Sequence, residues 1–177
     1  MTPILINNFI FFQLGWLACV LGGTGSWHWV GTMMVTGIVG FHLSRASQPR
    51  DEFMLILAAI LIGALWDSLL VWAGLLSYAN GILYAALAPH WIVAMWALFA
   101  TTLNLSLRWL KGRWLLAAVF GAIGGPLAYY AGFRLGAVDI PDMTNAMLAL
   151  AMGWAVLMPL LMSLSQRFNG FAHLESR

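Results

Sequence analysis

The sequence predicts an all-α integral membrane protein in which a bundle of about six transmembrane helices forms one domain. Hydrophobic residues make up 62% of the 177 residues and charged residues only 8%, and the mean hydropathy is +0.87. Soluble domains carry roughly 25% charged residues, so this chain has too few charges to build a water-soluble surface. Most of its surface must therefore face lipid.

Six apolar stretches supply the predicted helices of a single transmembrane domain over residues 1–177. We place the helices at residues 4–22, 27–43, 53–76, 90–107, 114–133 and 144–165. Each stretch is close to the roughly 20 residues that an α-helix needs to cross about 30 Å of hydrocarbon. No Lys or Arg precedes the first stretch, so we interpret it as a retained helix and not as a signal peptide.

The connection between the third and fourth predicted helices, residues 77–89, is semi-apolar and carries no charge. Two interpretations remain open for it. It is either a short interfacial or re-entrant segment, or a plain outer loop.

The basic residues predict how the bundle is oriented. Six helices place seven of the eight basic residues on one side of the membrane: Arg45, Arg50, Arg108, Lys111, Arg113, Arg167 and Arg177. The positive-inside rule makes that side cytoplasmic, and Arg134 is then the exception on the outside. We therefore expect a multi-pass protein of an inner (plasma) membrane with both termini in the cytoplasm.

Small residues recur along the fifth predicted helix every four positions, at Ala117, Gly121 and Gly125. Small residues at this spacing let two helix backbones approach closely. One interpretation is that this helix is the central, buried one. The alternative is functional: Pro126 kinks the helix and opens a cavity beneath Tyr129 and Tyr130.

Asp67 is an ionisable residue inside the third predicted helix, where a charge is costly and usually marks function. Gly63 and Ala64 are small residues on the same helical face, so this face can lie close to another helix. We expect Asp67 to face a packed neighbour. It is either a working acid/base group or a hydrogen-bonding group that joins two helices.

The fourth predicted helix has one face that is small or polar throughout. Its residues follow spacings of four and three: His90, Ala94, Ala97, Thr101, Asn104 and Arg108. This face forms either interhelical hydrogen bonds or the wall of a polar cavity.

The ends of several predicted helices place ionisable side chains near Asp67. His28 and His90 begin helices at the outer side and Arg134 ends one there, so we expect them to converge with Asp67 in an outward-facing pocket. A histidine beside a carboxylate is a usable acid or base, which makes Asp67 and His90 the candidate catalytic residues. The candidate substrate-binding residues are Arg134, Tyr129, His28 and Asn104.

We expect no cofactor, no metal and no nucleic-acid partner. The single Cys19 excludes a cysteine-based zinc cluster. His28, Asp67 and His90 are chemically able to bind a metal, although no ligand spacing supports it. A b-type haem needs two facing histidines. His28 and His42 are 14 residues apart, but at the same spacing after His90 the fourth predicted helix has Asn104 and not a histidine. A net charge of +2 is too small for nucleic-acid binding.

Several residues follow the pattern of a known family. They are Asn8, Gln13, Trp16, Asp67, Pro89-His90-Trp91, Trp96 and, most specifically, Gly124-Gly125-Pro126-Leu127-Ala128-Tyr129-Tyr130-Ala131-Gly132. Over nearly its whole length the chain resembles an uncharacterised bacterial inner-membrane family, the domain of unknown function 2878. The resemblance implies no established activity. An association of that family with cyclopropane-fatty-acid-synthase-like genes points to lipid modification, by analogy alone.

The sequence leaves three functions open, and with them whether the chain is an enzyme. The first is an accessory or enzyme of membrane-lipid or fatty-acid modification, with membrane lipids as partners. The second is a non-catalytic membrane scaffold or partner protein. The third is a small proton- or cation-coupled transporter with Asp67 as its ion site, although the chain lacks a clear inverted repeat. A homo-oligomer is also left open.

The predicted topology has a direct test. A reporter that is active only in the cytoplasm should be active when fused after Arg177. It should be inactive when inserted between Asp139 and Asp142, because that loop lies outside. The opposite pattern would reverse the predicted orientation.

Overall fold

The computed structural model describes residues 3–172, and the regular structure of this part of the chain is helical. Its six α-helices are α1 (Pro3–Gly23), α2 (His28–Arg45), α3 (Pro49–Trp72), α4 (His90–Leu103), α5 (Trp114–Arg134) and α6 (Met143–Arg167). A short 3-10 helix, η1 (Arg108–Leu110), lies between α4 and α5. The all-helical fold predicted from the sequence is confirmed.

Four of these helices, α1, α3, α5 and α6, are long and apolar enough to cross a membrane. The fold is therefore that of a helical membrane bundle. Helix α4 is shorter, with 14 residues, which corresponds to about 21 Å at 1.5 Å per residue. Its neighbours α1, α2 and α3 surround it, so this short helix lies mostly against protein.

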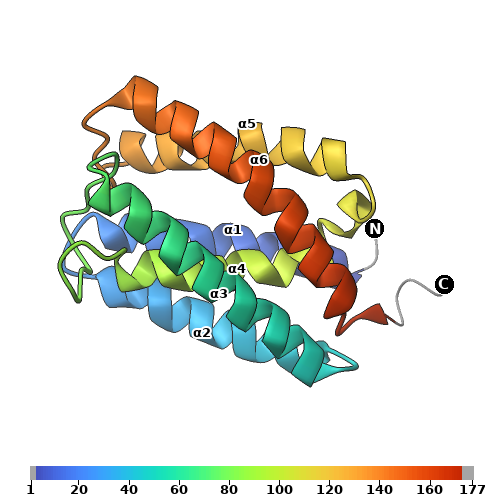
Figure 1. Cartoon of the computed structure of the whole chain (residues 1–177). Helices are drawn as coiled ribbons and strands as arrows, with labels where there is room; N and C mark the ends of the chain where they lie inside the picture. Colours follow the sequence, from blue (N-terminus) through green and yellow to red (C-terminus); the bar gives the residue numbers. More distant parts are fainter. Residues whose placement is uncertain (1–2, 173–177) are drawn as a thin grey trace.

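The helices run back and forth along one long axis (Figure 1). We call the end where α1 begins and α6 ends the terminus end. The connections 46–48 and 104–113 also lie there. The opposite end, which holds the connections 24–27, 73–89 and 135–142, is called the loop end.

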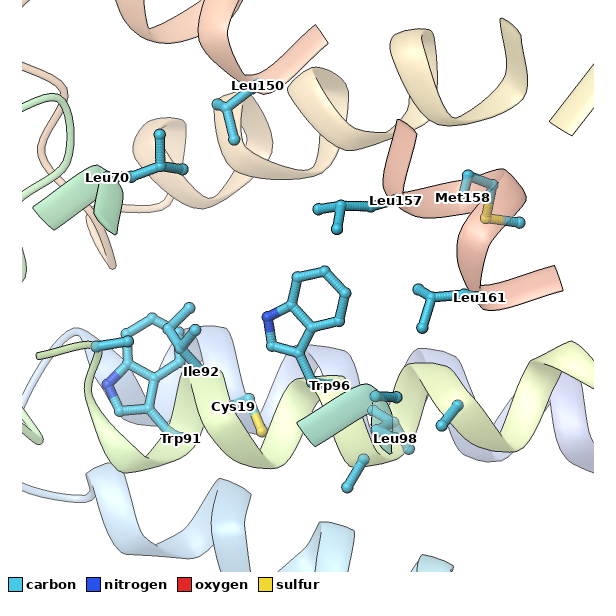
Figure 2. Packing of buried hydrophobic residues seen from close by; sticks show 14 of the residues in the cluster. Cys19, Leu70, Trp91, Ile92, Trp96, Leu98, Leu150, Leu157, Met158 and Leu161 are labelled. Carbon is cyan, nitrogen blue, oxygen red and sulfur yellow. The ribbon is translucent and has the colours of Figure 1, made fainter. Parts of the chain in front are cut away.

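Helix α4 lies at the centre of the first four helices and supplies the largest core side chains. Trp91 and Trp96 are almost fully buried, at 1% and 3% exposure. Figure 2 shows Trp96 projecting from α4 toward the leucines of α6. The expectation that the fifth helix is the central one is wrong, because α5 packs chiefly against α6 and leaves a broad apolar face exposed.

The small residues of α5 nevertheless make the predicted close contact, and their partner is α6. A Cβ atom added at Gly121 would lie 2.3 Å from the carbonyl oxygen of Trp154. One added at Gly125 would lie 2.3 Å from Cγ of the same tryptophan. Glycine at both positions therefore lets the backbone of α5 reach Trp154, as small residues do in membrane helix pairs.

Helix α3 begins and ends four residues earlier than residues 53–76. Pro49 lies in its first turn, where the missing N–H costs no hydrogen bond. Gly74 has φ +70°, and the N–H of Leu75 donates to the carbonyl of Leu70 at 3.0 Å. A glycine in this conformation with this hydrogen bond ends a helix. The shift brings Glu52 into the first turn of α3.

Helix α4 also ends four residues before the predicted Leu107. The hydroxyl groups of Thr101 and Thr102 donate to the carbonyls of Leu98 and Phe99. Such side-chain bonds compete with the continuing helix, and the chain turns after Leu103. Asn104 therefore caps α4, and the predicted helical face that ran on to Arg108 is interrupted.

The segment 73–89 contains no helix and folds over the loop end. Ser77 and Asp139 exchange two backbone hydrogen bonds, of 2.9 and 2.8 Å, which join this segment to the connection 135–142. The indole of Trp91 donates to the carbonyl of Asn80 at 3.1 Å, and its ring meets Tyr78 edge-on. The segment thus packs against Trp91 and is part of the folded protein.

The basic residues Arg45, Arg50, Arg108, Lys111, Arg113 and Arg167 lie at the terminus end, and Arg134 lies at the loop end. Arg177 lies outside the described residues. The charge asymmetry used for the orientation is thus present in the fold, and which end is cytoplasmic stays a prediction.

We predict that Gly125→Leu disrupts the packing of α5 on α6 and that Gly124→Leu does not. The Cβ at Gly125 meets Trp154, whereas a Cβ at Gly124 meets nothing within 4 Å. Overpacking of this kind typically costs about 1–3 kcal/mol. Thermal unfolding of both variants in detergent measures the difference, and equal stability would show that the contact with Trp154 is not close.

Candidate functional site

Asp67 lies in α3, five residues before the end of the helix, and its side chain is fully buried. Its carboxylate accepts two hydrogen bonds from neighbouring helices. Trp96 Nε1 of α4 donates to Oδ2 at 2.6 Å, and the Tyr129 hydroxyl of α5 donates to Oδ1 at 2.5 Å. The prediction that Asp67 faces a packed neighbour is confirmed, and one carboxylate joins three helices.

Close ring packing holds the partners of Asp67 in place. The rings of Trp96 and Trp154 stack with centroids 4.9 Å apart and planes 9° from parallel. Gly63 lies under Trp96, where an added Cβ would come within 1.9 Å of the ring, and Gly125 lies under Trp154. The two tryptophans therefore fill a space that two glycines leave open, and the indole N–H points at Asp67.

A second tyrosine lies in the electrostatic field of Asp67. The Tyr78 hydroxyl, from the segment 73–89, is buried and has no hydrogen-bond partner among the described residues. Burial raises the pKa of the Tyr78 phenol well above its usual value, and the charge of Asp67 raises it further. Tyr78 therefore keeps its proton at neutral pH and remains a hydrogen-bond donor.

An apolar cavity of about 310 Å³ lies beside this cluster, between α1, α4, α5 and α6. Its walls include Phe12 and Trp16 of α1, Gly124 of α5 and Trp154 of α6. A smaller cavity of about 40 Å³ shares Trp16 and Ala128 with it and is lined further on by Tyr78 and Tyr129. We call the two together the α1–α5 groove. The smaller cavity of the groove is the part lined by Tyr129, which bonds Asp67.

The two candidate histidines at the loop end contact each other. His28 Nδ1 and His90 Nε2 share a hydrogen bond of 2.8 Å, and the Thr32 hydroxyl lies 2.8 Å from His90 Nδ1. Trp29 stacks on the His90 ring with centroids 3.9 Å apart. Both nitrogens of His90 are thus engaged, in a pair that joins α2 to α4.

The structure does not bring the predicted outward-facing pocket together as one cluster. Asp67 bonds Trp96 and Tyr129, and the histidines bond each other. Arg134 is exposed at the end of α5 and donates to the Tyr130 hydroxyl at 3.3 Å. The predicted residues therefore form an Asp67–Tyr129 pair, a His28–His90 pair and a separate Arg134.

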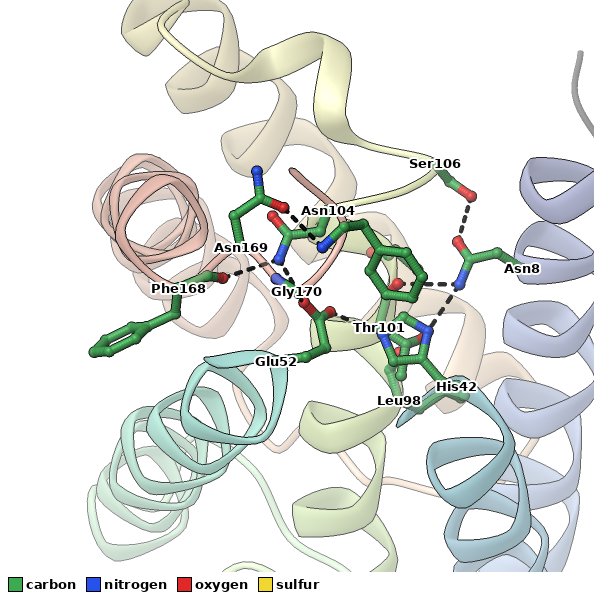
Figure 3. Close-up of polar contacts among 12 residues, drawn as sticks. Asn8, His42, Glu52, Leu98, Thr101, Asn104, Ser106, Phe168, Asn169 and Gly170 are labelled. Carbon is green, nitrogen blue, oxygen red and sulfur yellow. Dashed lines mark hydrogen bonds and ion pairs between the residues drawn. The ribbon is translucent and has the colours of Figure 1, made fainter. Parts of the chain in front are cut away.

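Asn104 belongs to a different polar cluster, at the terminus end, which centres on the fully buried Glu52 (Figure 3). His42 Nε2 donates to Glu52 Oε1 at 2.8 Å. Asn104 Nδ2 and the backbone N–H of Gly170 donate to Oε2 at 2.7 and 3.0 Å. Glu52 thus joins α2, the end of α4 and the chain after α6.

The sequence analysis does not predict Glu52 as a site residue, because residues 44–52 lie in the polar connection between the helices predicted at 27–43 and 53–76. Pro49 was the available signal, since proline favours the first turn of a helix and places Glu52 one turn inside it. His42, ten residues earlier across a short turn, is the partner that this signal would have suggested. A buried carboxylate near the membrane interior then needs donors.

Residues 5–160 match a family described as "Protein of unknown function (DUF2878)". The match covers most of the chain. The chain belongs to this family. Comparisons with curated proteins and with solved structures gave no match. The family description carries no activity, so any function must be argued from the groove and the polar clusters.

We predict that Asp67→Asn is tolerated far better than Asp67→Leu. An asparagine can accept from Trp96 through its oxygen and donate to Tyr129 through its amide, at a cost on the order of 1 kcal/mol. A leucine leaves both buried donors without acceptors, and each costs about 1–3 kcal/mol. Unfolding temperatures in detergent report the difference. If Asp67→Leu were as stable as the wild type, the carboxylate would not be what joins the three helices.

Proposed function

We propose that this protein binds a membrane lipid and takes part in its modification, with an acyl chain in the α1–α5 groove. The observation that carries the proposal is the position of Tyr129. It lines the smaller, apolar cavity of the α1–α5 groove and donates a hydrogen bond to the buried carboxylate of Asp67. An apolar channel that ends at an acid–base pair suits a substrate with a long chain and one polar group.

The composition of the groove supports a hydrocarbon occupant. Its wall is almost entirely apolar or aromatic, from Phe12 and Trp16 on one side to Trp154 on the other. Gly124 and Ala128 keep the α5 side of the groove shallow and open. Most of the wall of the larger cavity comes from the helices α1, α4, α5 and α6, whose backbone hydrogen bonds are made within each helix, so an acyl chain there meets little polar backbone.

The Asp67–Tyr129 pair supplies the acid–base chemistry of the proposal. The Tyr129 hydroxyl already donates a hydrogen bond to the Asp67 carboxylate. When the phenol oxygen accepts a proton from a substrate hydroxyl, Asp67 accepts the phenol proton in the same movement. The proton passes from the substrate hydroxyl to the carboxylate, so that Asp67 becomes neutral and the substrate oxygen carries the negative charge that makes it a nucleophile. Trp96 holds the carboxylate in place throughout.

The loop end supplies groups for the polar part of the lipid. His28 and His90 form a pair there, and Arg134 is exposed at the same end. His90 immediately precedes Trp91, which lines the small cavity of the groove. In the proposed orientation, with both termini in the cytoplasm of a bacterium, these groups face the outer leaflet of the inner membrane. They are proposed contacts for a head group.

Photo-crosslinking tests lipid binding in the groove. We expect a phospholipid with a diazirine in its acyl chain to label groove residues such as Phe12, Trp16 and Trp154 in the purified protein. Gly124→Leu should reduce this labelling severalfold, because the new side chain fills the groove while meeting no atom within 4 Å of its Cβ. Mass spectrometry of the peptides gives the measurement.

Gly37→Leu is the matched control, because Gly37 is also a helical glycine with nothing within 4 Å of an added Cβ, and it lies on α2 away from the groove. Equal labelling of wild type, Gly124→Leu and Gly37→Leu would refute binding in the groove. The lipid profile of a deletion strain carrying Asp67→Asn or Tyr129→Phe then separates modification from a scaffold. Full rescue by both variants would favour the scaffold.

A further inference from the structure

A second cavity, of about 150 Å³, lies at the terminus end between α1 and α2, away from the α1–α5 groove. Its polar lining comes from Asn7, Asn8, His42, Arg45 and Thr101, and the rest of its wall is apolar. Phe11 and Phe41, which meet edge-on with ring centroids 5.5 Å apart, form part of that wall. The cavity therefore combines a polar floor with an apolar side.

The floor of this cavity is built by buried hydrogen bonds. Asn8 donates to the carbonyl of Thr101 at 3.0 Å and accepts from the hydroxyl of Ser106. The amide of Asn8 is thereby fixed between α1 and the end of α4. Asn8 and Thr101 are both more than nine-tenths buried, so the floor is rigid before any ligand arrives.

His42 is the buried ionisable residue in the lining of this cavity. The ring is only 5% exposed, and its Nε2 donates to Glu52, whose two oxygens take two further hydrogen bonds from Asn104 and Gly170. This arrangement fixes the orientation of the ring, as a carboxylate does for many working histidines. Nδ1 has no partner among the described residues, and His42 lines the cavity. A ring nitrogen with no protein partner beside a cavity is available to a ligand.

Two further polar groups at the cavity are also without partners. Arg45, in the last turn of α2, and Asn7, in α1, are exposed and make no hydrogen bond or ion pair within residues 3–172. A guanidinium and an amide beside a histidine edge offer several N–H donors to one small region. This is the donor set that binds a phosphate.

We propose that this cavity binds the phosphate of an anionic phospholipid, with Arg45, Asn7 and His42 Nδ1 as its donors. Nδ1 donates to the phosphate from the doubly protonated ring, whose Nε2 donates to Glu52. The apolar wall of Phe11 and Phe41 receives the start of the acyl chains. The basic residues that gather at the terminus end attract the same lipids.

Binding to the purified full-length protein in neutral detergent tests the proposal. The probes are short-chain phosphatidylglycerol, inorganic phosphate, and a diacylglycerol of the same chain length that lacks the phosphate. We expect phosphatidylglycerol to bind and diacylglycerol not to bind, as measured by native mass spectrometry. His42→Gln and Arg45→Gln should each weaken phosphatidylglycerol binding about tenfold or more, the loss of one charge-assisted hydrogen bond.

The two variants keep the fold for different reasons. A glutamine at position 42 can still donate to Glu52, and Arg45 is exposed at the helix end. Arg50→Gln is the matched control, since Arg50 is a neighbouring exposed basic residue that does not line the cavity. Unchanged binding in both His42→Gln and Arg45→Gln, or equal binding of diacylglycerol, would overturn the proposal. Competition by inorganic phosphate would support the anion site and identify free phosphate as a second occupant.

The phosphate site at the terminus end is lined by other residues than the α1–α5 groove, so it does not depend on the proposed function. Gly124→Leu, which fills the α1–α5 groove, should leave phosphatidylglycerol binding unchanged. Loss of groove labelling with intact binding at the terminus end, or the reverse, shows which of the two proposals fails.

Discussion

Two carboxylates on one helix have to find hydrogen-bond donors inside a bundle that lipid surrounds. A buried charge without partners costs far more than any single packing contact contributes. Glu52 and Asp67 both lie on α3, one near each end, and both are fully buried. Their donors come from α2, α4, α5 and the chain after α6. Satisfying both at once fixes α3 against its neighbours along its whole length.

Close packing between glycines and tryptophans brings the hydrogen-bond donors within reach of Asp67. Gly63 and Gly125 leave room for the Trp96–Trp154 stack, which is the main link between α4 and the α5–α6 pair. Because α6 and not α5 packs onto the first four helices, a space remains between α5 and α1. The groove is thus a consequence of how the last two helices are attached, and Trp154, which stacks on Trp96, forms part of its wall.

The fold was predictable because it follows from composition and from the lengths of the apolar stretches. The contact made by Gly121 and Gly125 also followed from spacing, although its partner on α6 did not. Depth along a helix axis is readable from sequence, so the burial of Asp67 was expected. Position around the bundle is not readable, and the predicted cluster with Arg134 and His90 therefore failed to form. Glu52 was missed because its donors Asn104 and Gly170 lie 52 and 118 residues away.

The two carboxylates differ in the chemistry of their hydrogen-bond donors. Glu52 accepts from an imidazole, an amide and a backbone N–H, so both of its oxygens are committed to holding elements together. Asp67 accepts from an indole and a phenol, and a phenol can also give or take a proton. Beside it, the Tyr78 hydroxyl is buried without a partner. An unpartnered hydroxyl beside a carboxylate–phenol pair, on the wall of a cavity, is the arrangement expected where a ligand completes the hydrogen bonding, as the proposed lipid substrate would.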